Sequence, residues 1–64
     1  MDIIELGNIL KTARENKKMT QAEVAQKAGL GTNYYAVVER GEENISFKKI
    51  NKVLEVLGIK ITLP

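Results

Sequence analysis

Two short amphipathic segments separated by a glycine constrain this chain more than any other feature. Counting from Gln21, the first segment has Ala25 at its fifth position and Gly29 at its ninth. A larger residue than Ala25 would push two packed helices apart, and glycine readily adopts the left-handed conformation in which helices end. The pattern predicts two helices joined by a tight turn over about residues 20–40. Its remaining apolar positions are Leu30, Tyr35 and Val38.

Polar capping residues predict where three of the four expected helices begin. Asp2 with Glu5, and Thr20 with Glu23, have the capping-box spacing, in which side chains satisfy the unpaired N–H groups of a helix start. Ser46 is a good N-cap for the last helix. We expect helices over Ile3–Asn16, from Thr20 to an end at Gly29, from Thr32 to an end at Gly41, and from Ser46 to an end at Gly58.

Apolar residues at helical spacing give each expected helix a buried side. Tyr35 is expected in the core, with its hydroxyl reaching the edge. The other expected core residues are Ile3, Leu6, Leu10 and Ala13 in the first helix, Val24, Ala25 and Ala28 in the second, Val38 in the third, and Phe47, Ile50, Val53, Leu54 and Leu57 in the fourth.

The pattern changes after Gly58. Ile59, Ile61 and Leu63 alternate with Lys60 and Thr62, which predicts a short strand over about residues 59–63. Residues 1–64 are therefore predicted to form one all-α domain of four helices, or four to five elements, with a short C-terminal β-strand.

The composition argues against several classes of function. The 64 residues include no Cys and no His, which removes disulfides, Cys/His zinc sites and the usual imidazole base. Glu39 has no second acid, metal triad or glycine-rich phosphate loop beside it, so the sequence predicts no enzyme, cofactor or metal. No segment resembles a membrane span or a signal peptide, so we expect a cytoplasmic protein with no membrane partner.

The chain resembles the Cro and phage-repressor (XRE) family of helix-turn-helix regulators in the run TQAEVAQKAGLGTNYYAVVERG, followed by ISFKKINKVLEVLG. The resemblance covers about Leu6 to Gly58 and implies a lambda-repressor-like domain with its helix-turn-helix unit at about residues 20–40. It implies a sequence-specific repressor that binds double-stranded DNA at a two-fold operator as a homodimer, and the net charge of +2 permits that partner. The C-terminal tail also resembles HipB-type antitoxins, so binding a toxin protein is the alternative function.

The expected third helix is the candidate for reading base edges. By position in the family motif, its base-reading residues are Thr32, Asn33, Ala36 and Val37. Asn pairs bidentately with adenine, and the methyl groups of Thr and Val pack on thymine methyls. The segment from Thr32 to Val38 has no charged residue, whereas an ordinary surface helix would carry Lys and Glu. The alternative is a solvated helix surface.

Six residues are expected near the DNA backbone: Thr20, Gln21, Tyr34, Ser46, Lys48 and Lys49. Free amides and the dipole at the start of a helix suit a phosphate, which favours Thr20 and Gln21. Lys48 and Lys49 lie in the first turn of the last helix, where cations oppose the dipole unless a phosphate docks there. The alternatives are that Tyr34 is merely an exposed aromatic and that the lysines only aid solubility.

Two further sets of residues are assigned to structure and assembly. By resemblance, Arg14 and Glu39 form an ion pair that braces the helix-turn-helix. The expected C-terminal strand has no partner strand within the chain, so Ile59, Ile61 and Leu63 are expected to pair with their copies in a second subunit. The alternative is a frayed terminus.

Overall fold

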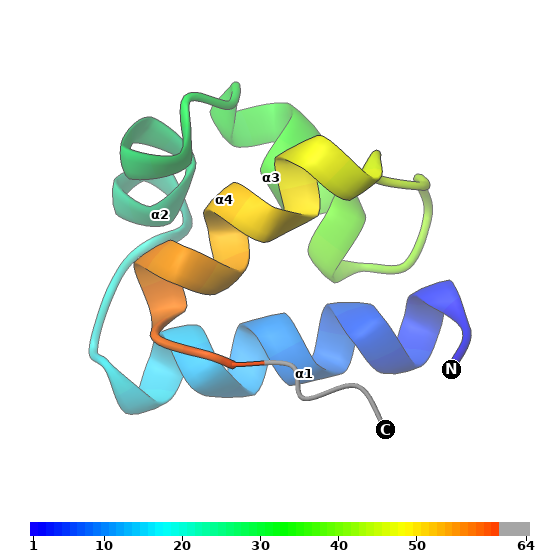
Figure 1. Ribbon diagram of the computed structural model, residues 1–64, viewed down its shortest axis with the longest axis horizontal. Helices are drawn as coiled ribbons and strands as arrows, with labels where there is room; N and C mark the ends of the chain where they lie inside the picture. The colour runs from blue at the N-terminus through cyan, green and yellow to red at the C-terminus, as the bar shows by residue number, and fades with distance from the viewer. Residues whose placement is uncertain (61–64) are drawn as a thin grey trace.

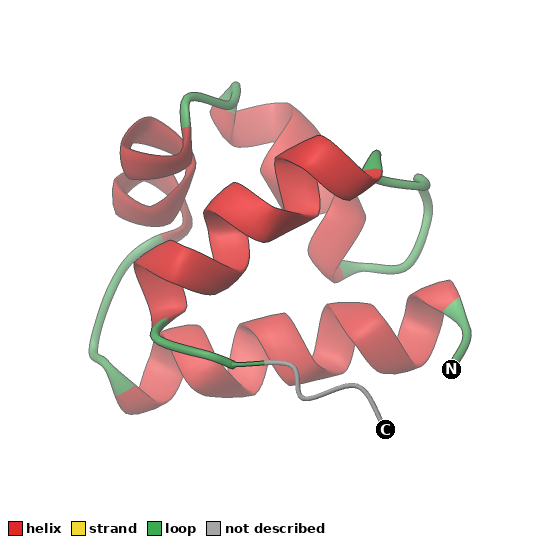
Figure 2. Ribbon diagram, in the orientation of Figure 1, coloured by secondary structure: helices red, strands yellow, loops and turns green. Residues whose placement is uncertain are grey.

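The structure, a computed structural model, describes residues 1–60, and they form four helices. These are α1 (Ile3–Asn16), α2 (Gln21–Ala28), α3 (Thr32–Glu39) and α4 (Phe47–Leu57) (Figure 1). The predicted all-α fold of four helices is therefore confirmed (Figure 2). Only the end of α3 differs, because Arg40 is its C-cap and the predicted end was Gly41.

Capping side chains begin three of the helices. At α2, the Thr20 hydroxyl accepts the N–H of Glu23 at 3.0 Å, and the Glu23 carboxylate accepts the N–H of Thr20 at 2.8 Å. Asp2 and Ser46 each accept a backbone N–H at the starts of α1 and α4. The α2 helix ends at Gly29, whose φ of 73° is left-handed, a conformation that glycine adopts without strain.

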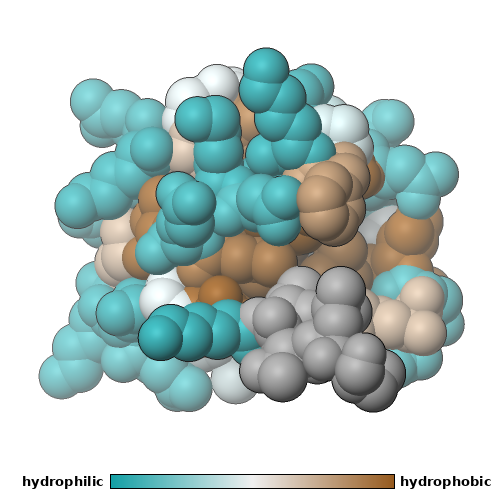
Figure 3. All heavy atoms as spheres, viewed as in Figure 1, coloured by the Kyte–Doolittle hydropathy of each residue, from teal (hydrophilic) through white to brown (hydrophobic). Residues whose placement is uncertain are grey.

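The four helices enclose one hydrophobic core. Helices α1 and α2 each pack against both α3 and α4, and Figure 1 shows α4 crossing in front with α1 along the bottom. On this side of the molecule, hydrophobic residues gather between α4 and α1, and hydrophilic residues cover much of α4 (Figure 3). The buried apolar residues are Leu10, Val24, Ala25, Ala28, Tyr35, Val38, Val53, Leu54 and Leu57.

Helix α1 approaches the end of α3 at Gly7, which is buried. A β-carbon at Gly7 would lie 2.8 Å from the carbonyl carbon of Glu39 and 2.8 Å from the carbonyl oxygen of Val38. A β-carbon at Gly41 would similarly lie 2.9 Å from the Cα of Ile4. Two glycines therefore bring the backbone of α1 directly against α3 and the residues that follow it.

Three predictions about the core are wrong. Phe47 is 80% exposed and Ile3 is 36% exposed. Both begin their helices, and helical periodicity shows which side a residue occupies but not whether another element covers it. Nothing in residues 1–60 covers Phe47. Tyr35 is fully buried with its hydroxyl, which therefore does not reach the edge of the core.

The predicted C-terminal strand is absent from the part of it that the structure describes. Ile59 and Lys60 form no strand. Instead, the N–H of Ile59 donates to the carbonyl of Leu54 at 2.9 Å, which completes the end of α4, and its side chain packs against the core. Ile61 and Leu63 lie outside the described residues. Of the helices described, none has both the length and the apolar character that crossing a bilayer requires.

Candidate functional site

A buried ion pair fixes the end of α3 against α1. Arg14 Nε donates to Glu39 Oε2 at 2.7 Å, and Arg14 Nη2 donates to Glu39 Oε1 at 3.0 Å. The Glu39 side chain is 2% exposed and that of Arg14 is 12% exposed. Arg14 also donates to the carbonyl of Met19 at 2.9 Å, in the loop before α2. The predicted pair is present, and its bidentate form fixes the orientation of both helices.

Gln21, expected at a phosphate, belongs to the same network. Its side-chain amide donates to Glu39 Oε1 at 3.0 Å, so one carboxylate joins α1, the start of α2 and the end of α3. Burial acts to raise the pKa of Glu39, but the hydrogen bonds from Arg14 and Gln21 hold that pKa below its ordinary value of 4.5. The Gln21 amide keeps a second N–H and its carbonyl for a further partner.

Tyr35 lies beside this network, and its ring is part of the hydrophobic core. Burial raises the pKa of Tyr35, and the negative charge of Glu39 adds to the effect. Within residues 1–60 the hydroxyl has no hydrogen-bond partner. A buried hydroxyl without a partner is unfavourable, so the aromatic ring is what stabilises this position.

The opposite side of α3 has no such bonds. Thr32 and Asn33 are exposed, whereas Ala36 and Val37 are half-buried. Gly31 is the N-cap and offers no side chain, so the first amides of α3 lack a side-chain partner. These four predicted base-reading residues lie on one uncharged side of α3, at i, i+1, i+4 and i+5.

Tyr34 connects α3 to the start of α4. Its ring lies 4.8 Å from the ammonium of Lys49, and its hydroxyl donates to the carbonyl of Asn44 at 3.3 Å. Cation–π attraction gives Lys49 a partner within the fold. The sequence could not show this contact, because the two residues are far apart in the chain. Lys48 is exposed and forms no ion pair within residues 1–60.

The remaining candidates lie where helices begin. Thr20 and Ser46 are exposed, and both hydroxyls accept capping bonds. The structure thus brings the α3 residues close to the first turn of α4 through Tyr34, and it ties Gln21 to the inner side of α3. Of the expected dimer residues, it describes only Ile59, which is half-buried. Among residues 1–60, no three acidic side chains cluster as a metal site would require.

The sequence is similar to several regulators. A family model described as helix-turn-helix matches residues 10–63. The immunity repressor protein of Bacillus phage phi105 is 35% identical over 57 residues, which are 89% of this chain and 40% of the repressor. The control protein C.MunI of a Mycoplasma species is 33% identical over 60 residues, which are 92% of this chain and 81% of that protein.

The fold is also found among solved structures. The crystal structure of the restriction-modification controller protein C.AhdI from Aeromonas hydrophila superposes with a TM-score of 0.87 at 33% identity. The match covers 91% of this chain and 88% of that one. The chain therefore spans less than half of the phage repressor, 40% of its length, but most of the two controller proteins.

Proposed function

The chain belongs to the helix-turn-helix family of DNA-binding transcription regulators, and on that premise we propose that it represses transcription in the cytoplasm by binding a two-fold operator as a homodimer. The observation that carries the proposal is the outer side of α3. It is exposed at Thr32 and Asn33, it has no charged residue before Glu39, and its first amides have no capping side chain.

Helix α3 would lie in the major groove, with its amino end toward the base edges. Asn33 supplies a donor and an acceptor for adenine, and Thr32 offers a hydroxyl and a methyl group. The half-buried Ala36 and Val37 contribute apolar surface for thymine methyls. Glu39 is buried in its ion pair, so it does not place a negative charge on this surface.

The backbone contacts would come from the starts of α2 and α4. A hydroxyl that accepts a capping bond keeps its own hydrogen, so Thr20 and Ser46 still donate to a phosphate. Gln21 donates through its second amide hydrogen. Lys48 and Lys49 supply the positive charge, and the Tyr34 ring holds the Lys49 ammonium beside α3.

Unbiased selection of binding sites by the purified protein tests this function. We expect enrichment of one two-fold sequence, with its half-sites about 34 Å apart, one turn of DNA. Replacing both Lys48 and Lys49 with Gln should weaken binding to all sequences alike and leave the selected sequence unchanged. If selection enriches no sequence above the starting pool, the chain is not a sequence-specific regulator.

The dimer is a separate part of the proposal. A chain of 64 residues has a small core, which a second subunit would stabilise. We propose that Ile59, Ile61 and Leu63 contribute to the contact. Ile61→Pro removes a backbone donor there and should convert a dimer to a monomer in sedimentation experiments. A variant that remains dimeric at micromolar concentration would place the contact elsewhere, with the exposed Phe47 as the first position to test.

The antitoxin alternative gains no support from the relatives found. Their names describe an immunity repressor and two controller proteins, and none of these names refers to a toxin. We therefore propose the repressor function alone.

A further inference from the structure

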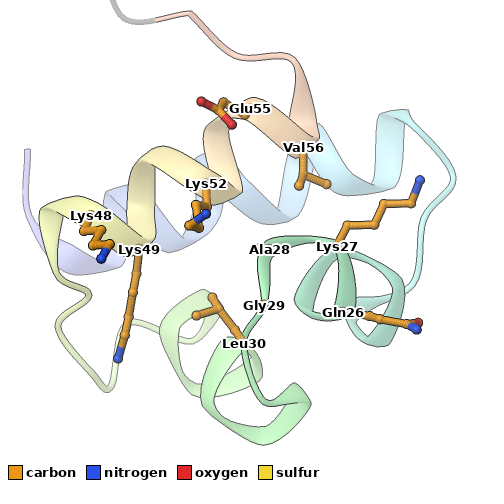
Figure 4. Close-up of a pocket in the computed structure, with 10 residues that line it drawn as sticks. All are labelled: Gln26, Lys27, Ala28, Gly29, Leu30, Lys48, Lys49, Lys52, Glu55 and Val56. Carbon is orange, nitrogen blue, oxygen red and sulfur yellow. The ribbon is translucent and has the colours of Figure 1, made fainter.

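A hollow of about 450 Å³ lies between α4 and the turn that joins α2 to α3 (Figure 4). Lys48, Lys49 and Lys52 line it from α4, and Lys27 lines it from the end of α2. Its one acidic residue is Glu55, and Figure 4 shows these residues spread along α4 with Lys27 on the facing helix. We call the hollow bounded by the four lysines the lysine groove.

The lysine groove holds the whole net positive charge of the chain. The chain has 10 Lys and Arg residues and 8 Asp and Glu residues. Four of the ten basic residues and one of the eight acidic residues line the groove. The rest of the molecule therefore has six basic and seven acidic side chains. Outside the groove the chain is therefore slightly negative, so the positive charge is concentrated on one surface.

The fold explains only part of this concentration. Lys27 lies in the last turn of α2, where a cation complements the helix dipole, and Lys49 lies against the ring of Tyr34. Lys48 and Lys52 are one helical turn apart, and Lys49 is three residues from Lys52, so like charges are neighbours on α4 and repel each other. Lys48 and Lys49 also oppose the dipole at the start of α4. Neither Lys27 nor Lys52 forms an ion pair within residues 1–60, although Glu55 lies nearby. An external anion would offset all of these repulsions.

We propose that the lysine groove binds the sugar-phosphate backbone of DNA next to the bases that α3 reads, with Lys27 and Lys52 as backbone contacts in addition to Lys48 and Lys49. This inference rests on the proposed function. The groove is continuous with α3, because its wall includes Gly29 and Leu30, which lead directly to Thr32. Lys49 in addition contacts Tyr34 of α3. DNA held by α3 would therefore have its phosphates close to the groove.

The residue types favour DNA over an acidic protein. Protein interfaces are enriched in aromatic residues and Arg and depleted in Lys, and the groove contains Lys but neither Arg nor an aromatic residue. Lysines on flexible stems suit phosphates whose positions do not depend on sequence. The groove would thus supply affinity for any DNA, whereas Thr32 and Asn33 would supply the choice of sequence.

The test compares two double variants of the full chain that lose the same charge. Lys27→Gln with Lys52→Gln changes the groove and leaves Lys48 and Lys49 in place. Lys17→Gln with Lys60→Gln is the control, because both lysines are exposed and neither lines the groove. Binding of each protein to the selected operator and to a scrambled duplex is measured from about 50 to 200 mM salt, the range over which backbone contacts change affinity most clearly.

We expect the groove variant to flatten the slope of log K against log salt by about 0.9 for each lysine removed in each bound protomer. The ratio of operator to scrambled affinity should stay as in the unchanged protein, and the control should flatten the slope less. Equal slopes for the groove variant and the control would overturn the inference without affecting the proposed function. Unchanged DNA binding with lost binding of poly-glutamate would instead assign the groove to an acidic protein.

Failure of the proposed function gives a different result. In that case the unchanged protein would select no operator and would still bind any duplex, with a salt slope that flattens in the groove variant. That result would overturn sequence-specific regulation and would support DNA binding by the lysine groove. Urea unfolding of the groove variant serves as the check on folding. Lys52→Gln removes repulsion between neighbouring lysines of α4, whereas Lys27→Gln removes a cation that complements the end of α2. Because the two effects are small and opposite in sign, the variant should unfold at nearly the same urea concentration as the unchanged protein.

Discussion

The two sides of α3 differ in almost every property that the structure records. The inner side places Tyr35, Val38 and Glu39 in the core, with Glu39 in a network of hydrogen bonds to two other helices. The outer side begins with Thr32 and Asn33, which are exposed and uncharged. One helix of eight residues thus keeps the side chains that hold it in place apart from those that we propose for binding.

This separation is needed because α3 is short. An isolated helix of this length is not stable in water, so its position depends on packing. The inner contacts set that position, and the outer residues are then free to differ without loss of the fold. Substitutions on the inner side should change stability, and substitutions on the outer side should change DNA recognition.

The largest effect is expected from Glu39→Gln. The substitution leaves Arg14 charged and mostly buried without its carboxylate, which should lower the free energy of unfolding by about 3 kcal/mol. Urea unfolding followed by circular dichroism measures the change. The matched control is Glu42→Gln, which breaks the exposed ion pair with Arg40 and should lower stability by less than about 1 kcal/mol. Equal losses in the two variants would mean that the inner network does not hold α3.

The second effect concerns the outer side of α3. Asn33→Ala should reduce discrimination at one base pair of the operator by about 1–3 kcal/mol. Because the Asn33 side chain is exposed and makes no hydrogen bond within residues 1–60, the free energy of unfolding should change by no more than about 0.5 kcal/mol. Competition binding with operators altered at single positions provides the measurement. A variant with unaltered discrimination at every position would remove Asn33 from the base-reading set.

A smaller effect, of opposite sign, is expected from Tyr35→Phe. The hydroxyl of Tyr35 is buried without a hydrogen-bond partner among the residues that the structure describes, so its removal should increase the free energy of unfolding by about 1 kcal/mol. Urea unfolding again provides the measurement. A decrease would show that the hydroxyl has a partner in solution, most simply Glu39, and that the inner side of α3 uses one more bond.

The smallest effect is a dependence on pH. Because the folded pKa of Glu39 is lowered below its ordinary value of 4.5, the network contributes its full stability above that value and loses it as pH falls through the folded pKa. Urea midpoints measured from pH 6 to about pH 3 should therefore decline for the unchanged protein and for Glu42→Gln. The decline should be shallower for Glu39→Gln, and parallel curves for all three proteins would contradict the assignment.

Much of the fold could be predicted because its signals are local. The capping box of Thr20 and Glu23 and the left-handed Gly29 depend only on neighbours in the chain, and they mark the bounds of α2 correctly. Phe47 and Ile3 were predicted wrongly, since burial at the end of a helix depends on whether a distant element covers it. Ile59 alternates with polar residues as a strand residue would, but its N–H donates to the carbonyl of Leu54 at the end of α4.

The candidate site could be predicted only in part for the same reason. Motif position identified the Arg14–Glu39 pair and the exposure of Thr32 and Asn33. The bond from Gln21 to Glu39, the contact of Lys49 with Tyr34 and the lysine groove join separate helices. No spacing rule along one helix relates such residues, so only the packed structure reveals them.

Under the proposed function, the close backbone contact at Gly7 would limit how DNA is accommodated. With no space for even a methyl group between α1 and the end of α3, a tilt of α3 toward α1 would bring backbone atoms into overlap. If two subunits bind one operator as proposed, part of any mismatch in shape would be absorbed by the duplex, which bends or twists at an energy set by its own sequence. Operators would consequently be distinguished partly by the stiffness of base pairs that no side chain reaches.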